Sequence, residues 1–291
     1  MNDVRVQISA VAGTRAGIEV AKNVEAAARA DKSAWSSKLG YGAIGWLVFI
    51  LGWHLVTLGN KISDIPTPAQ TWFALVEVLE QGVLWKNVVA SVFRVAWGFA
   101  IAAAVGIPLG ILMGWYPLTR KLFNPVVQGL RPISPIAWLA IAVTMFGGSN
   151  WLIDASDKSA IFLIFLSSFF PIVTATTAAV ATIERKFLRS AANFGVTGLD
   201  LFRRVILPAA MPQILTGLRL ALGIAWVVVV AAEMLGVSTG LGFQVNDARN
   251  MLRMDWVTAA MVIIGLIGLA LDYGISSITA STLARRGVDQ R

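Results

Sequence analysis

Long segments without a charged residue constrain this chain more than any other feature of its sequence. Residues 95–119, 132–153 and 159–183 contain no Asp, Glu, Lys or Arg, and residues 41–60 also lack all four, with His54 as their single histidine. A helix crosses a bilayer with about 20 mainly apolar residues, so each segment is long enough to span one. Only 14% of all residues are charged, well below the usual share in a soluble domain. The sequence therefore predicts an all-α, polytopic membrane protein.

Six membrane-spanning helices are predicted, at residues 41–60, 89–115, 125–148, 159–183, 211–235 and 256–279. Their connections alternate between the two sides, and most Lys and Arg residues lie on the side of the N-terminus, which the positive-inside rule makes cytoplasmic. Both termini are then cytoplasmic. The predicted organisation is a cytoplasmic tail (1–40), an N-terminal span (41–60), an external loop with an interfacial helix (61–87), a core of five spans (88–280) and a cytoplasmic C-terminal tail (281–291).

The sequence contains few groups suited to catalysis. It has no cysteine and a single histidine, and no G-x-x-x-x-G-K-S/T segment that would cradle the phosphates of ATP. We therefore expect no catalytic residue, no metal site and no cofactor on this chain. Its net charge of +8 follows from membrane topology, so it does not indicate binding to nucleic acid.

The connection between the fourth and fifth spans, residues 184–208, is longer than a simple turn requires. Its first part, RKFLRSAANFG, predicts a short helix that ends at Gly195, because glycine accepts the left-handed backbone of a helix stop. A second short helix, LDLFRRVIL, leads to Pro208, where the fifth span begins. Two short helices joined at a glycine are suited to insertion into a groove on another protein. This 184–208 loop is therefore the predicted docking element.

The 184–208 loop resembles the EAA loop of bacterial ABC importer permeases, whose form is E-A-A-x(3)-G-x(9)-I-x-L-P. The spacing from Gly195 to Val205, Leu207 and Pro208 matches this form, with Val in place of Ile. Arg189 and Ser190 stand where the family has Glu and Ala. The resemblance implies that the ATPase-docking residues are Arg189, Ser190, Ala191, Ala192, Phe194, Gly195, Leu207 and Pro208.

Three further segments resemble the nitrate, sulfonate and taurine branch of these permeases. They are SVFRVAWGFAIAAAVGIPLGILMG (91–114), LRPISPIAWLAIAV (130–143) and ILTGLRLALGIAWVVVVAAEMLGVSTGLGF (214–243). The resemblance implies a type I importer fold in the bacterial inner membrane and a dimer of permeases. It also implies two cytoplasmic ATPase subunits that bind ATP and Mg²⁺, and a periplasmic or lipid-anchored substrate-binding protein.

The same resemblance implies a small anion as substrate, such as nitrate, bicarbonate, cyanate, taurine or an alkanesulfonate. The Pro-Ile-Ser-Pro sequence at 132–135 is closer to the nitrate-type members than to the sulfonate-type members, in which Pro-Pro is commoner. A nitrate-type oxyanion is therefore the leading expectation.

Polar groups within spans are costly, and they are candidates for a transport path by default. Arginine and hydroxyl groups supply hydrogen-bond donors to an anion, and Pro132 and Pro135 break the third span and free backbone groups to line a cavity. Two alternatives stay open: Arg94 can snorkel to the interface, and Ser and Thr commonly hydrogen-bond within membrane helices. The candidate path residues are Arg94, Arg131, Ser134, Ser167, Ser168, Thr174, Thr216 and Glu233.

Other residues within the spans are expected to be structural. Arg219 and Asp272 can form an ion pair near the inner face. Gly106, Gly110 and Gly114 recur every four residues, which is typical of a close-packed helix face.

A stand-alone secondary transporter driven by an ion gradient is the alternative function. Such proteins usually contain inverted repeats and paired intramembrane ionisable residues, and no convincing repeat relates residues 41–148 to 159–279. Co-purification with an ATPase distinguishes the two functions.

Overall fold

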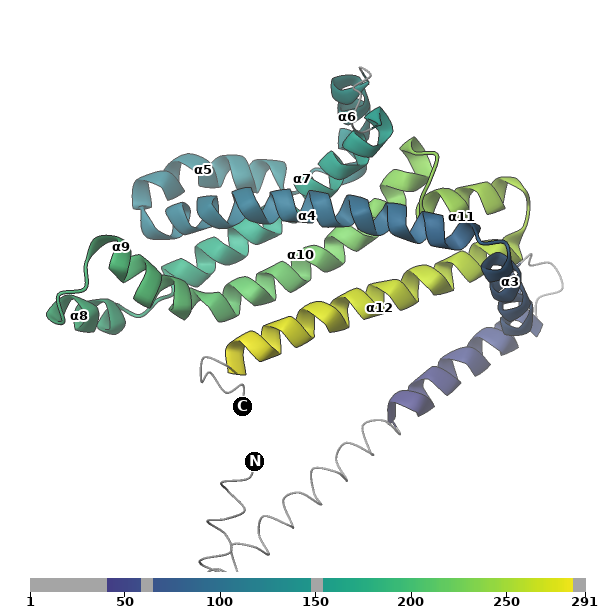
Figure 1. Ribbon diagram of the computed structural model, residues 1–291, viewed down its shortest axis with the longest axis horizontal. Coiled ribbons are helices and arrows are strands. Elements are labelled where there is room, and N and C mark those ends of the chain that lie inside the picture. The colour runs from purple at the N-terminus through teal and green to yellow at the C-terminus, as the bar shows by residue number, and fades with distance from the viewer. Residues whose placement is uncertain (1–40, 59–64, 148–153, 285–291) are drawn as a thin grey trace, which may run out of the picture. The chain divides into compact units, whose positions relative to one another are not determined.

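The computed structural model of the protein describes residues 41–58, 65–147 and 154–284 (Figure 1). Within these ranges the chain is helical almost throughout and contains no strand. It divides into two units, Met1–Pro68 and Ala69–Arg291, and the described part of the first unit is mainly one helix, Tyr41–Leu58. The elements that follow are α3 (Pro68–Glu80), α4 (Val83–Trp115), α5 (Pro117–Leu130), η1 (Pro135–Ala137), α6 (Trp138–Phe146), α7 (Ala155–Ala181), α8 (Arg185–Asn193), α9 (Gly198–Leu201), η2 (Phe202–Ile206), α10 (Leu207–Gly236), α11 (Leu241–Asn250) and α12 (Met254–Ala284).

Five of these helical segments are long and apolar enough to cross a membrane, and the number rises to six when α5 and η1–α6 count as one bent span. The five are Tyr41–Leu58, α4, α7, the continuous segment Gly198–Gly236 and α12. The predicted all-α membrane fold is confirmed. The predicted tails at 1–40 and 285–291, and residues 59–60 of the first span, lie outside the described residues.

Small residues at intervals of four allow α4 to pack closely against α7. Gly106 of α4 faces Ile172 of α7, Gly110 faces Thr176, and Gly114 faces Val180, so the two helices run in the same direction. A Cβ atom on Gly110 would lie 2.6 Å from the Thr176 Cβ, closer than two carbon atoms can approach. The predicted close-packed glycine face is confirmed.

The third span begins earlier than predicted and is broken in its middle. Only Tyr116 separates α4 from α5, so residues 117–124, which we expected to be a connection, form the first turns of a helix. Pro117 favours this start, because its fixed φ suits the first helical position and its missing N–H costs nothing there. Between α5 and η1–α6 the helix axis bends by 84°, which confirms the break expected at Pro132 and Pro135.

The fifth span also differs from the prediction. The second short helix of the loop and the fifth span, which we expected to be separate helices, are continuous, because α9, η2 and α10 follow one another without a gap. Residues Phe202–Ile206 form a π-helical turn that ends two residues before Pro208. Proline has no N–H to donate to the preceding turn, and a wider π turn is one way in which a helix accommodates a local interruption.

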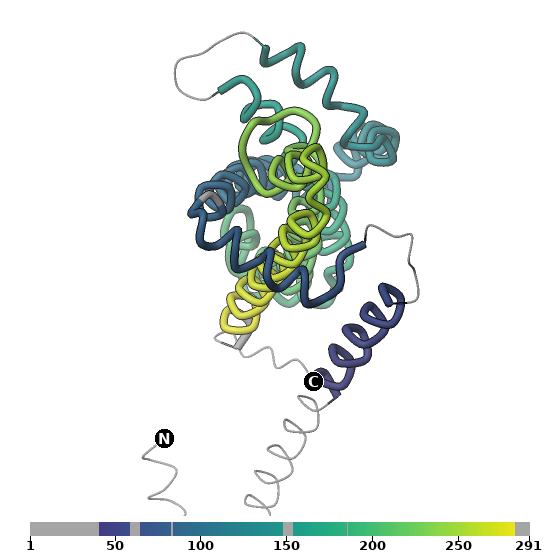
Figure 2. Tube along the Cα trace, turned by 90° about the vertical axis from the view of Figure 1, so that its right-hand side faces the viewer, coloured from purple at the N-terminus to yellow at the C-terminus, as the bar shows by residue number. Residues whose placement is uncertain are grey.

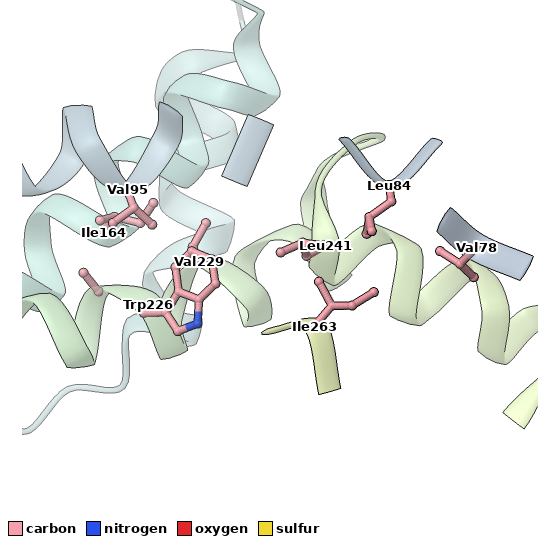
Figure 3. Packing of buried hydrophobic residues seen from close by; sticks show 9 residues of the cluster. Val78, Leu84, Val95, Ile164, Trp226, Val229, Leu241 and Ile263 are labelled. Carbon is pink, nitrogen blue, oxygen red and sulfur yellow. The ribbon is translucent and has the colours of Figure 1, made fainter. Parts of the chain in front are cut away.

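The core of the second unit lies where α4, α7 and α10 pack together, and α12 joins it along α10. Figure 3 shows Trp226 and Val229 beside Val95 and Ile164. The Trp226 Nε1–H donates a hydrogen bond of 3.1 Å to the Ile264 carbonyl on α12. Figure 2 views this unit from the side on which α11 lies in Figure 1. Trp226 is thus a packing residue.

Candidate functional site

The 184–208 loop is built on a glycine turn that the sequence predicts. Gly195 follows α8 with a φ of +71°, a conformation that side-chain-bearing residues rarely adopt. The Val196 N–H donates to the Ala191 carbonyl and the Gly195 N–H to the Ala192 carbonyl, each at 3.0 Å. This pair of bonds is the Schellman arrangement, which satisfies the last carbonyls of a helix. The predicted helix stop is confirmed.

The base of the loop is fixed to the bundle. Ala191 is buried, and Leu188, Leu201 and Phe202 pack against a cluster formed by Ala179, Val180, Ile206, Ala210 and Ile214. These contacts tie α8 and α9 to the ends of α7 and α10. The tip of the loop is therefore presented from a rigid support.

The tip itself exposes large apolar side chains. Phe194 is 85% exposed, Leu199 66% and Phe187 51%. Among the other predicted docking residues, Arg189, Ser190 and Ala192 are exposed, whereas Leu207 and Pro208 are partly buried in the first turn of α10. The loop thus brings most of the predicted docking residues into one exposed segment, and docking itself stays a prediction.

Arg94 lies at the opposite end of the bundle and is almost completely buried, with 1% of its surface exposed. Its Nε donates to Asp157 Oδ1 on α7 at 2.7 Å, and its Nη1 donates to Glu233 Oε1 on α10. Nη1 and Nη2 also donate to the Thr239 carbonyl and hydroxyl oxygens, at 2.9 and 2.6 Å. Arg94 therefore does not snorkel to an interface.

Glu233 is fully buried and accepts two further hydrogen bonds. The Ser91 hydroxyl donates to its Oε2 at 2.8 Å, and the Gly242 N–H donates to the same oxygen at 3.0 Å. Gly240 has a φ of +113°, and a Cβ there would overlap the Glu233 carboxylate. A residue with a side chain therefore does not fit at Gly240. We call Arg94, Glu233, Asp157, Ser91 and Thr239 the buried ion network.

The buried ion network also holds the start of α11. The Gly240 N–H donates to Asn87 Oδ1 at 3.0 Å, and the Leu241 N–H donates to the Ser91 hydroxyl at 2.9 Å. Half of the connection between the fifth and sixth spans, residues 236–255, is helix α11, with Leu241, Gln244 and Ala248 buried. The bonds from Asn87 and Ser91 provide partners for N–H groups that a helix start leaves free.

The sequence identified Arg94 and Glu233 as candidates but missed their partners. Asn87, Ser91 and Arg94 are spaced four and three residues apart, the spacing of one helix face. This row of polar residues on α4 is the sequence feature from which a buried polar network could have been predicted. The donors of Arg94 are thus engaged within the chain by two carboxylates and Thr239.

The predicted ion pair between Arg219 and Asp272 is confirmed. Arg219 Nε donates to Asp272 Oδ1 at 2.7 Å and Nη2 to Oδ2 at 2.6 Å. Both side chains are about half exposed.

The remaining candidate path residues are spread over several elements. The hydroxyls of Ser167, Thr174 and Thr216 each donate to a carbonyl of their own helix. Ser168 is fully buried, and its Oγ has no partner among the described residues. Arg131 and Ser134 are exposed at the break of the third span. The structure therefore does not assemble these candidates into one site, and their role in a path stays a prediction.

The described residues contain no group of three or more His, Cys, Asp and Glu side chains that could hold a metal ion.

Several known proteins are similar to this chain over most of its length. Residues 106–282 match the family described as binding-protein-dependent transport system inner membrane component. A nitrate import permease protein from Leptolyngbya laminosa is 35% identical, over 82% of this chain and 85% of the relative. A taurine transport system permease protein from Escherichia coli is 34% identical, over 81% and 86%. A bicarbonate transport system permease protein from Synechocystis is 33% identical, over 88% and 94%.

A solved structure shares the fold at much lower identity. The crystal structure of an amino acid ABC transporter covers 72% of this chain and 97% of its own, with a TM-score of 0.57 and 14% identity. From the matched family, the permease relatives and this shared fold, we conclude that the chain belongs to the inner-membrane permease components of binding-protein-dependent transport systems, as the non-catalytic, membrane-spanning subunit of an ABC importer whose ATPase is a separate subunit.

Proposed function

We propose that this chain forms the translocation path for a small anion in a bacterial inner membrane and couples to two cytoplasmic ATPase subunits through the 184–208 loop. The observation that carries the proposal is the exposure of Phe194 beside the Gly195 turn, on a loop whose base is packed against α7 and α10. An exposed aromatic side chain on a rigid support is suited to fill a pocket on a partner. In this arrangement a movement of the partner reaches the ends of α7 and α10.

The proposed complex contains two copies of the permease and a periplasmic or lipid-anchored binding protein that delivers the substrate. ATP and Mg²⁺ bind to the ATPase subunits and not to this chain. Both termini face the cytoplasm in this arrangement. The bias of basic residues toward the loop side of the spans supports the orientation. No observation favours the stand-alone secondary transporter.

We propose a nitrate-type oxyanion as the substrate. Three relatives are named for nitrate, bicarbonate and taurine at nearly equal identity, which supports a substrate of this kind without separating the three. The Pro-Ile-Ser-Pro sequence at 132–135 supports the nitrate type.

The test is reconstitution of the permease with its ATPase and binding-protein partners in proteoliposomes. We expect nitrate, added with the binding protein, to stimulate ATP hydrolysis and to accumulate inside the vesicles more than bicarbonate or taurine does. Stimulation by taurine alone would contradict the nitrate assignment. Uptake that persists without any ATPase subunit would contradict the importer.

A further inference from the structure

Helix α5 carries a stripe of polar side chains along one face. Lys121, Asn124, Gln128 and Arg131 follow one another at spacings of three, four and three residues, which places them within about a quarter of the helix circumference. Arg131 caps the helix with helical backbone angles, and its N–H donates to the Val127 carbonyl. The stripe extends over ten residue steps along the helix axis, or roughly 15 Å. We call these four residues the α5 polar stripe.

All four side chains of the α5 polar stripe are exposed, and none has a hydrogen-bond or ion-pair partner among the described residues. The other faces of α5 differ from the stripe. Val127 is buried in a cluster with Met113, Phe170 and Val173. The third face is apolar and exposed, with Leu118, Leu122 and Val126. Helix α5 thus has one packed face, one apolar face and one polar face.

The α5 polar stripe does not suit contact with lipid. Helix α5 is part of the bent third span, and ionisable or amide side chains within a span face protein or water because lipid cannot hydrogen-bond to them. The apolar face with Leu122 and Val126 suits lipid or a protein neighbour. The stripe therefore faces a water-filled space or a hydrogen-bonding partner.

The chemistry of the stripe selects an anion as its occupant. Its two ends are cations, its two amides between them supply N–H donors, and α5 contains no Asp or Glu. Two arginines of other spans are compensated inside the chain: Arg94 by Glu233 and Asp157, and Arg219 by Asp272. Arg131 has no such carboxylate among the described residues. A row of uncompensated donors is complementary to a small oxyanion.

The position of the stripe connects the break in the third span with the loop end of the bundle. Gly114, two residues before the α4–α5 turn, packs against Val180 at the end of α7, and the 184–208 loop follows α7 directly. Lys121 therefore lies toward the loop end, and Arg131 lies at the 84° bend.

We propose that the α5 polar stripe lines the half of the anion path that leads from the break to the cytoplasm, with Arg131 as the residue that first receives the anion there. This proposal rests on the proposed function and deepens it. It adds Lys121, Asn124 and Gln128 to the path.

The sequence contains no cysteine, so single cysteines can be introduced without altering a native thiol. We compare Asn124→Cys and Gln128→Cys on the stripe with Leu122→Cys and Val126→Cys on the apolar face, each in the assembled transporter in inside-out membrane vesicles. The probes are an anionic methanethiosulfonate with a sulfonate group and a cationic one with a trimethylammonium group. We expect the stripe positions to react with the anionic reagent roughly tenfold faster than the apolar-face positions, the low end of the enrichment that focused charge produces.

The charge of Arg131 is tested in the same experiment. Adding Arg131→Gln to Gln128→Cys should remove most of the preference for the anionic over the cationic reagent, whereas Arg131→Lys should retain it. Equal labelling of both faces, protection of the stripe in the assembled dimer, or an anion preference unchanged by Arg131→Gln would overturn the proposal. The labelling needs no transport, so it is separate from the proposed function, which fails if no ATPase co-purifies with the chain.

Discussion

The two ends of the α4–α7–α10 bundle differ in whether their side chains find partners within the chain. At one end, Arg94 and Glu233 are buried and bond to each other and to their neighbours within the chain. At the other end, Phe194 and Leu199 are exposed on the 184–208 loop. The first end is chemically complete in a single chain, whereas the second presents apolar surface that a partner can cover.

This difference indicates a division of roles between the ends. Burying an ion pair has a desolvation cost that its attraction often only offsets, so its presence is weak support for a role in stability alone. The buried ion network joins α4, α7 and α10 to the start of α11. We infer that it fixes the geometry at this end, so that a movement imposed at the 184–208 loop is transmitted along helices held together at their far ends.

Breaking the buried ion network should have the largest effect on stability. The variant Arg94→Met leaves Glu233 as an uncompensated charge in a fully buried site, and we expect it to lower the free energy of unfolding by about 3–5 kcal/mol. Thermal unfolding of the purified complex in detergent measures this. The matched variant Asp157→Asn should cost less, because the Asp157 side chain is 25% exposed. Equal melting temperatures for Arg94→Met and the wild type would show that the network is not structural.

Adding a methyl group at the contact between α4 and α7 should have an intermediate effect on stability. The variant Gly110→Ala places a methyl group against Thr176, and such overpacking typically costs about 1–3 kcal/mol. The control is Gly223→Ala in α10, where nothing lies within 4 Å of the added Cβ. This variant should be neutral or slightly stabilising, since alanine is the better helix former. The comparison of the two melting temperatures tests the close packing of α4 against α7. A lowered melting temperature in both variants would contradict it.

The exposed ion pair between Arg253 and Glu77 should contribute least to stability. Arg253 and Trp256 donate hydrogen bonds to Glu77 at 2.7 and 3.0 Å, and the bond from Arg253 holds the pKa of Glu77 below its ordinary value. Because the pKa of Glu77 is lowered in the folded state, the stabilisation that this ion pair gives is fully present above the ordinary glutamate pKa of about 4.3. It is lost as the pH falls through the lowered pKa. Glu77→Gln should therefore reduce the difference in melting temperature between pH 7 and acid pH slightly. A larger effect than that of Gly110→Ala would be inconsistent with an exposed pair.

Features that depend on local spacing were predicted from the sequence. Uncharged runs locate the spans because the bilayer sets their length, and the four-residue spacing of Gly106, Gly110 and Gly114 locates the face of α4 that meets α7. The helix stop at Gly195 was predicted for the same reason, since the conformation of one glycine decides it.

Features that depend on distant partners were not predicted. Asp157 and Thr239 are 63 and 145 residues from Arg94 in the chain, and no local pattern relates them to it. The start of α5 was missed because residues 117–124 are as polar as a connecting loop. The continuity of α9, η2 and α10 was missed because a proline suggests a break, whereas here a π turn precedes Pro208.

The central claim is that the exposed tip of the 184–208 loop transmits ATP hydrolysis to the membrane path. Its most direct test is the ratio of anion uptake to ATP hydrolysis for Phe194→Asp in the reconstituted transporter, with Phe194→Tyr as the matched control. Because Phe194 is 85% exposed, its replacement should leave thermal unfolding of the chain unchanged. We expect uptake per ATP to fall by about tenfold or more, since truncating a hot-spot aromatic costs about 2 kcal/mol or more, while Phe194→Tyr stays near the wild-type ratio. Uptake per ATP at the wild-type level in Phe194→Asp would contradict the claim.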